Sequence, residues 1–138
     1  MAFMPQEGSL RLISAAEDML VKVWDMVLNT EIATIRGATV QSGRATCFAF
    51  SKDFKTVMIG YRDGSISFLN TQKEFKLIHS VKCDASLGFE SDEEEVNSLA
   101  YLTFGGTTSY LAVACTSGKL VILDLATMEP CFLEEDFV

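Results

Sequence analysis

The same strand ending recurs three times in this chain, and this recurrence constrains the fold more than any other feature. Residues 21–25 end in Trp-Asp, and Leu69 with Asn70 and Leu123 with Asp124 stand in the same frame, 45 and then a further 54 residues downstream. Six residues before each ending lies a tight-turn position, at Asp18, Asp63 and Ser117. A unit recurring at this length predicts a repeat architecture, in which each unit is one supersecondary element.

The middle unit shows most clearly how one repeat folds. We expect four strands in it, over residues 45–51, 56–61, 65–69 and 75–81. Asp63 and Gly64 stand between the second and third of these, and Asp-Gly favours a tight hairpin because it tolerates positive φ. Four antiparallel strands joined by short turns make one blade of a propeller.

The other two units repeat this order less completely. The third unit predicts strands over residues 96–102, 110–115, 119–123 and 130–133. The first predicts strands over residues 10–15, 20–24 and 31–35, and its first strand is nearly absent, so the chain is expected to begin inside a repeat. β-branched residues argue against a helix near residues 18–24. We therefore expect an all-β protein of about three blades, with units over residues 1–37, 38–83 and 96–133 and an acidic loop over residues 84–95.

These units resemble WD repeats, a propeller family whose blades typically end in Trp-Asp. The resemblance spans about residues 3–133 and rests on residues 13–25, 47–53 and 63–66. It implies a structural hydrogen-bond network of a strand hydroxyl, a turn Asp, a His and the Trp. The first unit retains three of these positions and the second retains one, so the implied structural residues are Ser14, Asp18, Trp24 and Asp63.

The sequence departs from the family in two respects. Arg36 and Gly37 stand roughly where the family carries Gly-His, and no His follows, so the blades must rely more on packing than on the network. WD propellers usually have seven blades, and three units cannot close a ring without leaving sheet faces and edges open. Either the chain is a piece of a longer polypeptide, which we favour, or other chains complete the ring.

Charge and hydropathy exclude several function classes. The net charge of −8 lacks the basic footprint of a nucleic-acid-binding protein, so no direct nucleic-acid contact is expected. No signal peptide and no apolar stretch of about 18 residues is present, so we expect no membrane partner and an intracellular place, in the nucleus or cytoplasm.

Residues typical of catalysis or metal binding are few. The four cysteines form no Cys-x-x-Cys pair, and the only histidine, His79, falls in a predicted strand where a structural role is the default. No nucleophile or phosphate-loop motif occurs. We therefore predict no enzymatic activity, no metal site and no cofactor.

An acidic run and one rim of the blades are the candidate partner-binding regions. The run is Asp92, Glu93, Glu94 and Glu95, which either forms a solvated surface loop or docks a basic partner, and Ser91 before it resembles an acidophilic-kinase site. The rim positions at the hairpin ends are Glu17, Tyr61, Arg62 and Thr116. Tyr and Arg are common hot-spot residues, and the alternative is that Tyr61 merely packs at the blade top and Arg62 is solvated. Trp24 is expected to be a packing anchor.

The sequence thus predicts a non-catalytic WD-repeat scaffold for protein–protein interactions. Its mechanism would be binding, because fixed blades hold loops in place and little ordering entropy is lost when a partner docks. We expect it to work as part of a multi-subunit complex. Residues 21–27 loosely resemble WD proteins of ribosome biogenesis. The alternative is an adaptor that recognises a substrate or peptide, such as a ubiquitin-ligase receptor.

Overall fold

The chain forms three four-stranded antiparallel sheets. The structure is a computed structural model, and it describes residues 2–6, 9–15, 20–36, 44–73, 75–82, 95–104, 108–116, 118 and 120–134. The first sheet contains β1 (Ala2–Gln6), β2 (Ser9–Ala15), β3 (Leu20–Asp25) and β4 (Thr30–Arg36). The second contains β5 (Ala45–Phe50), β6 (Thr56–Tyr61), β7 (Ser65–Asn70) and β8 (Lys76–Lys82). The third contains β9 (Val96–Phe104), β10 (Thr108–Cys115), β11 (Leu120–Asp124) and β12 (Glu129–Glu134).

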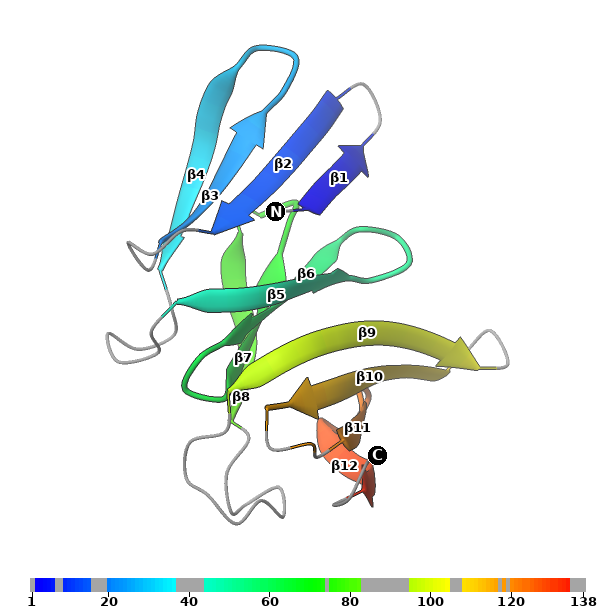
Figure 1. Cartoon of the computed structure of the whole chain (residues 1–138). Coiled ribbons are helices and arrows are strands. Elements are labelled where there is room, and N and C mark those ends of the chain that lie inside the picture. Colours follow the sequence, from blue (N-terminus) through cyan, green and yellow to red (C-terminus); the bar gives the residue numbers. More distant parts are fainter. Residues whose placement is uncertain are drawn as a thin grey trace.

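The three sheets follow one another in chain order, as Figure 1 shows. Each is a meander in which every strand pairs with the next along the chain, and the described strands do not close into a ring. The predicted all-β class with about three blades is confirmed. Among the described residues there is no helix with the length and apolarity to cross a membrane.

Register irregularities occur at equivalent positions of the three sheets, at the spacing seen in the sequence. The pairing of the third strand with the fourth shifts register between Val23 and Trp24 in the first sheet. The same shift falls between Phe68 and Leu69 in the second sheet, and immediately before Leu123 in the third. A bulge changes the direction of the strand that carries it. Because the bulge falls at the equivalent place in each unit, the three sheets have the same backbone course at this point.

The expectation that the first unit nearly lacks its first strand was wrong. Ala2–Gln6 forms β1, which pairs with β2 along its whole length, from Ala2 opposite Ile13 to Gln6 opposite Ser9. Pro5 lowers the strand signal in the sequence because proline cannot donate to a ladder. β1 is an edge strand of its sheet, where a missing N–H is tolerated.

The two central strands of the second sheet, β6 and β7, are buried on both faces. Val57, Ile59 and Tyr61 of β6 pack with apolar side chains of the first sheet. Met58 of the same strand packs into a cluster with side chains of the third sheet. Ser67 is only 2% exposed, so the alternation of β7 reflects two buried faces rather than one buried and one solvated face.

The second and third sheets approach each other closely at Gly60. A Cβ atom at this position would lie 2.6 Å from Val96 Cγ1 and 2.7 Å from Cys47 Sγ. The Thr46 hydroxyl shares its one proton between the backbone oxygen of Gly60, at 3.2 Å, and that of Val96. One threonine thus joins the two sheets where no room remains for a side chain.

Gly60→Ala is expected to destabilise the fold by about 1 to 3 kcal/mol, the usual cost of overpacking a filled core. The measurement is the free energy of unfolding in urea, followed by circular dichroism. Ser98→Ala, at an exposed position of β9, is the control and should change it by no more than about 0.5 kcal/mol. A Gly60→Ala variant as stable as the control would contradict the packing described here.

Candidate interaction site

One end of each sheet carries a capped turn between its third and fourth strands. The Asp25 carboxylate accepts hydrogen bonds from the backbone N–H groups of Val27, at 2.9 Å, and Leu28, at 3.0 Å. Asn70 and Asp124 each accept from the N–H two residues further on, at 2.9 and 2.8 Å. The polar residue that ends the recurring motif therefore closes a turn, as Asx side chains commonly do.

The opposite end carries the hairpins that contain the predicted rim residues. Arg62 is exposed, and its N–H donates to the backbone oxygen of Arg44 at 3.1 Å. Thr116 is also exposed, and its N–H donates to the oxygen of Glu95 at 3.1 Å. Each hairpin is thus tied to the residue just before the first strand of its own sheet. These two strands, β5 and β9, are packed against each other, so the four residues belong to one rim.

Asp63 has a structural place in this rim. Its carboxylate accepts a hydrogen bond from the Ser65 N–H at 2.9 Å and another from the Ser65 hydroxyl. Gly64 between them has a φ of 93°, and Gly118 in the equivalent hairpin has a φ of 89°. Both turns therefore need the left-handed backbone that glycine adopts without strain.

Tyr61 does not offer a surface to a partner in this arrangement. Its side chain is 0% exposed and packs between the first and second sheets. Its hydroxyl and that of Ser67 are both buried, and neither has a hydrogen-bond partner among the described residues. Burial raises the pKa of the Tyr61 phenol above its usual value, and the negative charge of Asp63 raises it further. Of the predicted Tyr61–Arg62 pair, only Arg62 is exposed to a partner in this structure.

Trp24 and Ser14 meet on the face of the first sheet that points away from the second. The Trp24 indole N–H donates to the Ser14 hydroxyl at 3.0 Å. The Lys22 ammonium lies 5.9 Å from the centre of the indole ring, close enough for a cation–π interaction. Two members of the predicted network are therefore joined.

The remaining predicted residues cannot be placed with these. Glu17, Asp18, Ser91, Asp92, Glu93 and Glu94 lie outside the described residues. Glu95 is the exception, because it is described, is partly buried and directly precedes β9, where it belongs to the rim with Thr116.

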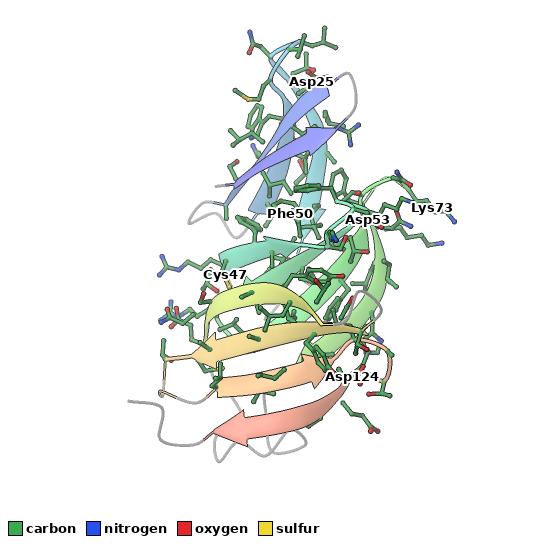
Figure 2. All side chains as sticks on the ribbon, turned by 90° about the vertical axis from the view of Figure 1, so that its right-hand side faces the viewer. Asp25, Cys47, Phe50, Asp53, Lys73 and Asp124 are labelled. Carbon is green, nitrogen blue, oxygen red and sulfur yellow. The ribbon has the colours of Figure 1, made fainter. Side chains whose placement is uncertain are left out.

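Sequence reasoning missed a cavity of about 610 Å³ at the end of the capped turns. It opens between the second and third sheets, and its walls include Phe68, Tyr101 and Met128. Figure 2 shows Asp53, Lys73 and Asp124 along this side of the molecule, with Cys47 on the other. No motif marks the cavity, because it arises from how two sheets diverge and not from one stretch of sequence.

Two cysteine side chains lie within the described part of the chain. Cys47 and Cys115 are free thiols, and Cys115 is buried. Burial raises the pKa of the Cys47 thiol, which keeps it protonated and therefore a poor nucleophile. Within the described part of the chain, no three His, Cys, Asp or Glu side chains gather as metal ligands would.

Tyr61→Phe is expected to raise the free energy of unfolding at neutral pH by about 1 kcal/mol, because it removes a buried hydroxyl that lacks a partner. Guanidinium unfolding measures this. Tyr110→Phe, at a partly exposed tyrosine, is the matched control. A loss of stability in Tyr61→Phe would show that the hydroxyl is satisfied.

The same residue should make stability depend on alkaline pH. Because its folded pKa is raised, the stabilisation from the protonated phenol is complete below the unfolded pKa of about 10 and is lost as pH rises through the folded value. The part of the alkaline loss that comes from Tyr61 should be missing in Tyr61→Phe, which unfolding curves between pH 8 and 12 would reveal.

Comparison with known proteins finds distant relatives. Over 121 residues the chain is 30% identical to the angio-associated migratory cell protein of Homo sapiens and to that of Pongo abelii, and 27% identical to that of Canis lupus familiaris. The aligned region covers 85% of this chain and 28% of each relative, so the chain spans little more than a quarter of their length. No protein-family profile matches the chain.

Proposed function

We propose that the chain is a non-catalytic, WD-repeat-like scaffold that binds other proteins. The observation that carries this proposal is that the two outermost sheet faces bear apolar side chains that no other sheet covers. In the first sheet, Val21 and Val23 are 0% exposed and pack toward the second sheet. Leu12 and Trp24, which alternate with the inward positions on β2 and β3, are only half-buried. This outer face carries apolar surface that a further layer would cover.

The third sheet repeats this asymmetry at the other end of the stack. Leu111 and Val121 are 0% exposed and face the second sheet. Ala112 and Leu120 point the opposite way and are only partly buried, and Leu102 of β9 lies on the same face. Apolar faces at both ends of a stack are typical of a repeat array that continues beyond its described units.

Further blades are the partners that fit these faces best. They would come from a longer polypeptide or from another chain, and the span of the chain relative to its relatives supports the first source. A completed ring would present the rim of Arg62 and Thr116 to other proteins. Assembly into a multi-subunit complex of the nucleus or cytoplasm, with ribosome biogenesis as the process, is the finer form of this proposal. The proposed function involves no direct contact of this chain with nucleic acid or membrane.

An adaptor that recognises peptides, as a ubiquitin-ligase receptor does, is the second candidate. The cavity between the second and third sheets favours it, since 610 Å³ is within the range of ligand sites. The first candidate predicts a stable complex on purification, and the second predicts micromolar peptide binding.

The full chain should self-associate through its outer faces, because each copy presents two apolar faces of different shape. Light scattering should give a mass above the 15.2 kDa of one chain, and Leu120→Glu should return it to the mass of one. Leu77→Glu is the control, because Leu77 is 48% exposed on an edge strand and not on an outer face. A single-chain mass for the unmodified protein at all concentrations would contradict the proposal.

Arg62→Glu should weaken capture of partner proteins from cell extract at least several-fold, because a central interface arginine commonly contributes 2 kcal/mol or more. Quantitative mass spectrometry of co-purified proteins measures this. Lys52→Glu makes the same change of charge at an exposed position on the opposite end and should leave capture intact. Equal capture by both variants would remove this rim from the interaction surface.

A further inference from the structure

The cavity between the second and third sheets has two apolar walls. One is formed by the face of the second sheet, through Met58, Phe68 and Ile78. Leu125 and Met128, from the turn that joins β11 to β12, belong to the other wall. Methionine side chains adapt to varied apolar shapes, so two of them in one site suit a ligand of variable outline.

A single charge marks this cavity. Among the described residues that line it, Asp124 is the one charged side chain and none is a cation. One carboxylate oxygen of Asp124 accepts from the Ala126 N–H at 2.8 Å. The other has no partner among the described residues. The hydroxyls of Tyr101 and Ser109 are 2.8 Å apart and are hydrogen-bonded to each other. The second carboxylate oxygen of Asp124 can therefore accept a hydrogen bond from a cation or from an N–H group of a ligand.

The apolar surface continues from the cavity onto an edge strand. Ile78 lines the cavity and is 56% exposed, and Leu77 beside it is 48% exposed. Both belong to β8, the last strand in the order of its sheet. An edge strand has one open row of backbone groups, to which an extended peptide can add as a further strand. A small apolar molecule would make no use of that row.

We propose that this cavity binds an extended segment of a partner protein through a large apolar side chain that is followed directly by Arg or Lys. The apolar side chain enters between Phe68 and Met128, and the cation reaches the Asp124 carboxylate. The net charge of −8 attracts such a cationic segment over longer distances. This inference rests on the proposed protein-binding function and gives it a site on the end of the blades opposite Arg62.

Methyl NMR on the full chain tests this with methionine as the probe. Met58 and Met128 line the cavity, whereas Met26 is 37% exposed on a turn of the first sheet and serves as an internal control. The peptide acetyl-Gly-Gly-Phe-Arg-Gly-Gly-amide should shift the first two methyl signals and not the third. Replacing its Phe by Ala, or its Arg by Glu, should weaken binding about tenfold or more.

Two variants of the protein separate the apolar from the charged contribution. Ala126→Trp fills the cavity and should abolish the peptide-induced shifts. Asp124→Asn keeps a side-chain oxygen to cap the turn, as Asn70 does in the second sheet, and should remove only the preference for Arg over Glu. Circular dichroism confirms that each variant is folded.

Three outcomes would overturn the proposal: unchanged Met58 and Met128 signals at millimolar peptide, equal shifts at Met26, or an unaltered Arg preference in Asp124→Asn. The scaffold function is judged separately, by capture that depends on Arg62. If that capture persists while the peptides leave the cavity methyls unmoved, the cavity proposal alone fails. If both are absent, the scaffold function fails with it.

Discussion

The close approach of the second and third sheets at Gly60 is the constraint on which the rest of this arrangement depends. Strands β5 and β9 lie side by side only because no side chain occupies that position. The Thr46 hydroxyl spans the gap to the Val96 backbone oxygen. Gly60 and the Thr46 hydroxyl hold the two sheets together here, whereas bulky apolar side chains do so further out. The spacing between the sheets that results is the space that the apolar cluster of Met58 and Leu111 fills.

The two ends of the sheets differ in chemistry as a consequence of this geometry. Near Gly60 the sheets are in contact, and the rim beside them carries short turns held by glycine and by backbone hydrogen bonds. Toward Asp124 the same sheets diverge, and the space between them is the cavity. A partner at the rim would meet exposed charge such as Arg62, whereas a partner at the cavity would meet apolar surface with one carboxylate. Under the proposed function, the two ends of the sheets would therefore suit different ligands.

The sequence predicts the strand plan well because hydrophobic runs and turn residues are local signals. The recurring ending at Trp24, Leu69 and Leu123 coincides with the bulges, since both reflect the backbone plan of one unit. β1 was missed because Pro5 suppresses the strand signal, and only the position of β1 at an edge makes that proline harmless. The strand pattern could not show that Tyr61 would be buried, because its burial depends on the first sheet packing over it. The cavity involves residues more than 70 positions apart in the chain, so no local pattern encodes it.

Burial of β6 and β7 on both faces should slow their amide hydrogen exchange relative to the other two sheets. The first and third sheets each have one face packed against the second sheet, so each can open without disturbing the other. The amide protons of β6 and β7 can exchange with solvent only after at least one neighbouring sheet has moved away. Hydrogen exchange in this chain should therefore form a gradient, slowest in the centre and faster toward both ends. Any blade that docks on an outer face would slow exchange in the sheet it covers and leave the far end of the stack unchanged.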